Sequence, residues 1–136
     1  GGKILKADVR LKKWFNNDQI KIMKEAIEDH RASASHAPRS IFGKIIAEAD
    51  RDIEPEIVFR RTIQFGLSHY PELDKEKQWK RFLEHMDNKY SSHGYIRLWI
   101  PTSDNAKKLQ EIRALIAQPI KLKQIFDNLY NEELSL

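Results

Sequence analysis

The sequence predicts an all-α protein, a helical bundle of about six to seven helices in a single domain over residues 1–136. Three observations support this prediction. Apolar residues recur every three or four positions along most of the chain. Only five Gly and five Pro interrupt that periodicity. A proline or a capping side chain precedes several of the segments in which the apolar repeat starts again.

The first half of the chain predicts three helices, over residues 3–15, 18–30 and 39–51. Between the last two, residues 31–38 form a loop, because Pro38 disfavours helical backbone in the residue before it. Each helix carries one apolar stripe that we expect to be buried. The three stripes are Ile4, Ala7, Leu11 and Trp14; then Ile20, Met23 and Ile27; and then Phe42, Ile45, Ile46 and Ala49.

The second half predicts four further helices. They begin near Pro55, after the capping residue Asp74, at Ser103 or Asp104, and at Pro119. Their apolar stripes are Ile57, Phe59, Ile63 and Leu67; Trp79, Phe82, Leu83, Met86 and Tyr90; Leu109, Ile112 and Ile116; and Leu122, Ile125, Phe126 and Leu129. Residues 95–100 alternate like a strand, but no second strand is present to pair with them, so we expect an extended connector.

Composition excludes several classes of protein. The chain has no Cys, which rules out disulfides and thiolate metal sites and favours a cytoplasmic location. No run of 18 apolar residues occurs, so we expect no membrane-spanning helix and no membrane partner. The net charge of +4 suits an anionic ligand. The cations are scattered among 20 acidic residues with no basic stripe of interleaved aromatics, which argues against a nucleic-acid partner.

Two polar residues continue apolar stripes of predicted helices. His30 lies three residues beyond Ile27, and Asp50 lies four residues beyond Ile46. Burying either side chain without a partner would cost about 1–3 kcal/mol, so something must satisfy each. His36 lies in the loop between them. Imidazole nitrogen and carboxylate oxygen suit a divalent metal ion, namely Mn, Fe, Co, Ni, Zn or Mg, and these three residues are the candidate ligands.

Four cations surround these candidate ligands within 21 residues: Arg31, Arg39, Lys44 and Arg51. A metal ion beside several cations suits a phosphate ester. The metal polarises phosphoryl oxygens and makes hydroxide from bound water, while Arg and Lys offset the charge on the phosphoryl group. The four cations are therefore candidate substrate contacts, and a phosphorylated small molecule or nucleotide is the expected partner. We find no candidate catalytic group beyond metal-bound water.

Each of these residues also has an ordinary structural interpretation. A helical His on an apolar face is often a hydrogen-bonded core residue, and an inward Asp near a helix C-terminus often binds an Arg or a loop amide. His36 can be a simple exposed histidine, and the four cations can lie on solvated helix faces. Spacing alone leaves both interpretations open, because His30, His36 and Asp50 lack the tight spacing of common helical metal sites.

A resemblance to a known family favours the metal interpretation. The strings EDHRAS at 28–33, HAPRSIFGKI at 36–45 and AEADR at 47–51 resemble the second half of bacterial HD-domain hydrolases. RRTIQFGLSHYP at 60–71 and YIRLWI at 95–100 are similar to the end of the same proteins. Members of this family are helical bundles that bind metal through a His, a His-Asp dipeptide and a distant Asp, and some members add two further histidines.

The resemblance implies roles for three residues. Asp50 matches the distant Asp, and His30 and His36 match the intermediate histidines. It also implies hydrolysis of phosphomonoesters or phosphodiesters, often nucleotides. The chain departs from the family in having no His-Asp dipeptide. We therefore expect it to be the C-terminal portion of such a hydrolase, with part of the metal site, weak metal binding or none, and little activity alone.

Two further expectations concern partners. The face on which the missing helices would pack could support a homodimer. The alternative to an enzyme is a non-catalytic helical interaction module that binds a nucleotide, RNA or a protein partner. In that case the purified protein would carry no metal, or Asp50→Ala would leave its metal content unchanged.

Overall fold

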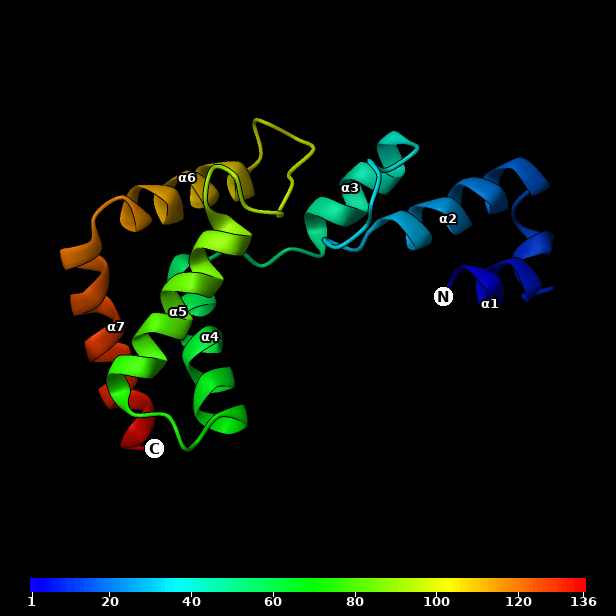
Figure 1. The fold of residues 1–136 in the computed structure, drawn as a ribbon. Helices are drawn as coiled ribbons and strands as arrows, with labels where there is room; N and C mark the ends of the chain where they lie inside the picture. The colour runs from blue at the N-terminus through cyan, green and yellow to red at the C-terminus, as the bar shows by residue number, and fades with distance from the viewer. The chain divides into compact units, whose positions relative to one another are not determined.

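The computed structural model describes all 136 residues and contains α-helices, one short 3-10 helix and no strand (Figure 1). The elements are α1 (Gly2–Ala7), the 3-10 helix (Leu11–Lys13), α2 (Asn17–Asp29), α3 (Ile41–Ala49), α4 (Pro55–His69), α5 (Lys75–Tyr90), α6 (Asp104–Ile116) and α7 (Pro119–Leu134). The predictions of an all-α fold with seven helices, and of a connector rather than a strand at 95–100, are confirmed. None of the helices combines the length and apolar character needed to span a bilayer.

The chain forms two compact units. The first comprises Gly1–Arg51 and Arg97–Ser103, and the second comprises Asp52–Ile96 and Asp104–Leu136. Each unit has buried side chains of its own. The single domain expected for residues 1–136 stays a prediction.

The second unit is built on the apolar stripes of α4, α5, α6 and α7. Three phenylalanines meet at its centre: the ring centroid of Phe82 lies 5.6 Å from that of Phe59 and 5.2 Å from that of Phe126. Ile112 of α6 and Leu122 of α7 are fully buried beside them. All five belong to the predicted stripes, so the periodicity located most of the packed faces. Ile57 of α4, which was predicted to be buried in the same stripe as Phe59, is 38% exposed.

Helix ends in the second unit are held by polar contacts. The carboxylate of Asp74 accepts a hydrogen bond from the backbone N–H of Lys77 and so caps α5, as expected. The buried amide of Gln78 donates to the carbonyl oxygens of Gly66 and Tyr70, which joins the start of α5 to the end of α4. Pro55 and Pro119 occupy the first turns of α4 and α7.

The first unit packs α2 between α1 and α3. Asn16 and Gln19 form a capping box at the start of α2, and the Ser40 hydroxyl accepts from the Gly43 N–H at the start of α3. A Cβ added at Gly43 would lie 3.1 Å from Pro38 Cβ, which is a tight contact, and 3.6 Å from the Ala26 Cα, which is an ordinary van der Waals contact. Small residues thus let α3 lie directly against α2.

The face of α3 predicted to be buried is exposed. Phe42, Ile45 and Ile46 keep 55%, 48% and 41% of their surface accessible, and Ala49 is also exposed. The packed face carries Gly43, Ala47 and Glu48 instead, because small residues permit the close approach to α2. The prediction for this helix was wrong about which side faces the protein.

The helix predicted over residues 3–15 is also shorter than expected. It ends at Ala7, because the Asp8 carboxylate accepts from the backbone N–H and the guanidinium of Arg10, and the Asp8 backbone is extended. A separate 3-10 turn follows. Ile4 and Trp14, which were expected in one buried stripe, are both exposed.

Substitutions in α7 test the core of the second unit. We expect Leu122→Ala to lower the free energy of unfolding by about 2–5 kcal/mol, because it leaves a cavity in a fully buried site. Ile120→Ala, two residues earlier and 80% exposed, should change it by less than about 0.5 kcal/mol. Urea denaturation followed by circular dichroism measures both, and equal losses in the two variants would contradict this core.

Candidate functional site

His30 follows the last residue of α2 and is half-buried. Its Nδ1 lies 2.5 Å from the carbonyl oxygen of Ile27. A carbonyl oxygen can only accept, so Nδ1 carries the proton and Nε2 keeps a lone pair. Metal-binding histidines commonly have this arrangement, in which the second ring nitrogen is held by a backbone carbonyl. The same hydrogen bond also fits the structural alternative, in which His30 is simply a hydrogen-bonded residue at the end of a helix.

His36 lies in the loop between α2 and α3 and is exposed. Its Nδ1 is 2.9 Å from the carbonyl oxygen of Ala37, which again leaves Nε2 with the lone pair. That Nε2 lies 4.0 Å from Oδ1 of Asp29. In their neutral form the two predicted histidines thus share one tautomer. Nε2 of His30 has no protein partner, whereas Nε2 of His36 faces the Asp29 carboxylate.

Asp50 follows the last residue of α3 and is exposed. The prediction that its carboxylate points into the protein was wrong, because the apolar stripe that it continues is itself exposed. Arg51 then links the ends of the two helices: its guanidinium donates to the carbonyl oxygen of Ala47 and to that of His30, the latter at 3.3 Å. This contact places His30 beside the last turn of α3, next to which Asp50 lies.

The four predicted phosphate contacts divide into two pairs. Arg39 and Arg51 are held by groups of the protein itself. Burial lowers the pKa of the Arg51 guanidinium, while the carboxylates of Glu48 and Asp50 oppose that shift. Arg31 is exposed and Lys44 is half-buried on α3, and neither forms an ion pair with an acidic side chain.

A buried carboxylate that sequence reasoning missed holds this region together. The Asp29 side chain is only 1% exposed and accepts from three donors of Arg39: the backbone N–H at 2.9 Å, Nε at 3.0 and 3.2 Å, and Nη2 at 2.9 Å. These bonds lower the pKa of Asp29. Glu28 accepts from the same guanidinium at 3.0 Å. The Asp29–Arg39 pair closes the loop that carries His36.

Glu48 is the second buried carboxylate that was missed. It accepts from the backbone N–H of Trp99 at 3.0 Å and from the hydroxyl of Ser103. It thereby ties the segment Arg97–Ser103 to α3 in the first unit. Nothing in the local sequence separates Glu48 from an ordinary surface Glu, because its partners lie about 50 residues away.

These residues do not form a complete metal site. His30, His36 and Asp50 are donors of the right chemistry, and both histidines have the suitable tautomer. However, no three His, Asp or Glu side chains of the chain gather closely enough to hold one ion. Asp29 lies nearest to His36, but its two oxygens already bind Arg39.

Comparison with known proteins gives no match: no family model, no curated protein and no solved structure is similar to this chain. The HD-type assignment accordingly stays a prediction. It rests on the strings quoted from residues 28–51, 60–71 and 95–100.

Replacing Asp29 tests the buried pair. We expect Asp29→Asn to lower the free energy of unfolding of the first unit by about 2 kcal/mol at pH 7, because charge-assisted hydrogen bonds to Arg39 are weakened. The folded pKa lies below its ordinary value of 3.8, so this stability is present above pH 4 or so and is lost as the pH falls through the folded pKa. Denaturant titrations at several pH values measure it.

The matched control is Asp50→Asn in the same unit, where the carboxylate is exposed. It should change the free energy of unfolding by less than about 0.5 kcal/mol at any of these pH values. If the penalty of Asp29→Asn were the same at pH 3 and at pH 7, the carboxylate would not be the stabilising species.

Proposed function

We propose that this chain is part of a metal-dependent phosphohydrolase of the HD type that acts on a phosphate ester, with nucleotides as the first substrates to test. His30, His36 and Asp50 are its contribution to a divalent-metal site whose other ligands lie outside these residues. The observation that carries the proposal is that Nδ1 of each histidine lies against a carbonyl oxygen, which leaves Nε2 as the ring nitrogen for a metal ion.

The other residues have separate roles in this proposal. A metal ion held by these residues together with ligands outside them would supply an activated water and would polarise the phosphoryl oxygens. Arg31 and Lys44 are the cations that have no acidic partner in the protein, so they are the first candidates to contact phosphate. Arg39 and Arg51 chiefly position the loop and the helix ends, and their own contact with phosphate stays a prediction. The absence of Cys supports a cytoplasmic location.

Metal content and phosphate release test the proposal. A protein in which this chain follows a segment with a His and a His-Asp dipeptide should hydrolyse a nucleotide or an aryl phosphate with Mn, Fe, Co, Ni, Zn or Mg present, and Asp50→Ala or His30→Ala should lower the rate by roughly 100-fold or more. His93→Ala is the control, because His93 is exposed and pairs only with Asp87. The 136-residue chain should bind metal weakly.

Two results would count against it. One is no phosphate release from any member of the panel with any of the metals. The other is a metal content, measured by mass spectrometry of the purified protein, that Asp50→Ala and His30→Ala leave unchanged.

A second candidate function has one observation in its favour. The apolar stripe of Phe42, Ile45 and Ile46 is exposed on α3, as in an interaction module that binds a nucleotide, RNA or a protein partner. A metal-free protein that binds RNA with a steep dependence on salt, and loses this affinity in Lys44→Ala, would favour this module over the hydrolase.

A further inference from the structure

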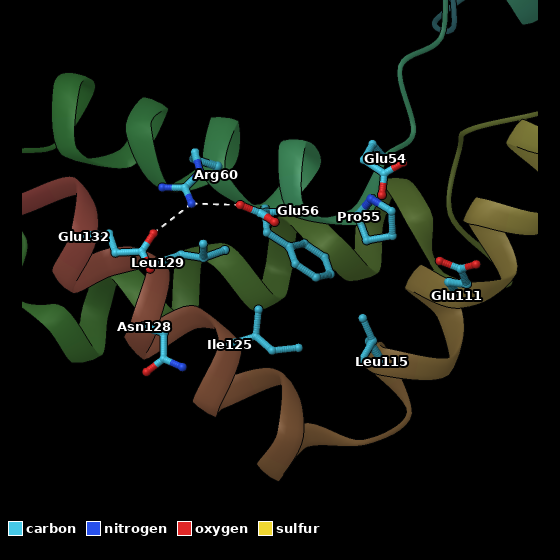
Figure 2. A pocket seen from close by; sticks show the side chains of 11 residues that line it. Glu54, Pro55, Glu56, Arg60, Glu111, Leu115, Ile125, Asn128, Leu129 and Glu132 are labelled. Carbon is cyan, nitrogen blue, oxygen red and sulfur yellow. Dashed lines mark hydrogen bonds and ion pairs between the residues drawn. The ribbon is translucent and has the colours of Figure 1, made fainter.

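An open cavity of about 520 Å³ lies in the second unit, between α4, α6 and α7 (Figure 2). Its floor is apolar and is formed by Phe59 of α4, Leu115 of α6, and Ile125 and Leu129 of α7. Its volume lies in the range of about 300–1,000 Å³ that ligand-binding cavities occupy. We call this cavity the groove.

The rim of the groove is acidic. Glu54 and Glu56 line it at the start of α4, Glu111 on α6 and Glu132 on α7. Figure 2 shows these carboxylates around the apolar floor, with Arg60 as the only cation among the lining residues.

The cations near the groove do not neutralise this rim. Arg60 pairs with Glu56 at 2.9 Å and Glu132 at 2.8 Å, and also with Glu133 at 2.8 Å, and these carboxylates raise its pKa. Lys108 pairs with Glu54 at 3.0 Å. These two cations therefore pair with four carboxylates, and a fifth, that of Glu111, has no ion-pair partner. An apolar floor inside an uncompensated acidic rim suits an apolar side chain flanked by cations.

The chain itself contains such a segment. Residues 1–15, which we call the N-terminal segment, hold five of the 24 Lys and Arg but only one of the 20 Asp and Glu. The remainder of the chain thus carries no net formal charge, and the whole excess of +4 lies in this segment. It also exposes 77% of Ile4, 69% of Val9 and 80% of Trp14. Lys12 and Lys13 directly precede Trp14 in the 3-10 turn.

We propose that the groove binds the N-terminal segment of a second copy of this chain, with Trp14 on the apolar floor and Lys12 and Lys13 against the acidic rim. Tryptophan is one of the residues enriched among the anchors of interfaces, and rim charges of opposite sign set the register and speed of association. The segment of one copy binds the groove of another, so two copies can exchange segments in a dimer, or many copies can join in a longer assembly. This assembly is independent of the proposed hydrolase activity.

Association is measured by sedimentation of the 136-residue chain over a range of protein concentrations. The mass should rise with concentration above the monomer value of 16.0 kDa. Raising the salt concentration should weaken the association, because rim charges are screened. Trp14→Ala should weaken it by roughly tenfold or more. A chain that stays monomeric at every concentration overturns the proposal.

Two controls separate the groove from other surfaces. Phe42→Ala removes another exposed aromatic side chain, from α3, and should leave the association unchanged. If Phe42→Ala abolishes the association and Trp14→Ala does not, the contact runs through α3 and the proposal is wrong. Circular dichroism establishes that both variants keep their helices.

A charge exchange gives the sharpest test. Glu111→Lys in one sample and the pair Lys12→Glu and Lys13→Glu in another should each weaken association, since each places like charges together. In a mixture of the two samples, the native segment of the Glu111→Lys variant meets the native groove of the other variant. The altered groove meets the altered segment, with both signs reversed. The association constant of the mixture should therefore lie within roughly threefold of that of the unaltered chain. A mixture that stays monomeric, or that binds no better than the separate variants, contradicts the pairing of segment and groove.

Discussion

The first unit depends on one buried ion pair. The Asp29 carboxylate has lost almost all contact with solvent, and a buried carboxylate is tolerated only where its oxygens are hydrogen-bonded and a cation lies beside it. Arg39 supplies the cation and three donors, including its own backbone N–H. Because these bonds join the end of α2 to the residue before the α3 cap, they determine where the loop with His36 lies and where α3 begins.

The packing of α3 follows from that constraint. Once its first residues are held beside the end of α2, the helices can approach closely only where side chains are small, at Gly43 and Ala47. The large apolar residues of α3 then lie on the opposite side. Ordinary amphipathic reasoning assigns the larger side chains to the interior. In α3 the close contact that small residues allow with α2 outweighs the burial of the larger apolar side chains, so the apolar stripe of α3 remains exposed.

The second unit shows the usual relation between pattern and packing. Its helices each have an apolar stripe of large side chains, these stripes meet around Phe82, and polar contacts such as those of Gln78 hold the helix ends. The charge distribution differs between the units as well. Carboxylates gather around the groove of the second unit, and the excess of cations lies in residues 1–15 of the first. The net charge of the whole chain, +4, reveals neither feature.

The sequence by itself determined the helical class, the absence of a strand at 95–100 and most of the buried faces of α4 to α7, since these depend on local periodicity and on capping at positions such as Asp74. It also singled out His30 and His36, whose tautomers follow from carbonyl oxygens within three residues. Only the tertiary structure decided that Asp29 and Glu48 are buried, that Asp50 is exposed and that α3 packs on its small residues. These outcomes depend on partners 10 to 55 residues away, and a local pattern carries no information about which distant donor will meet a given carboxylate.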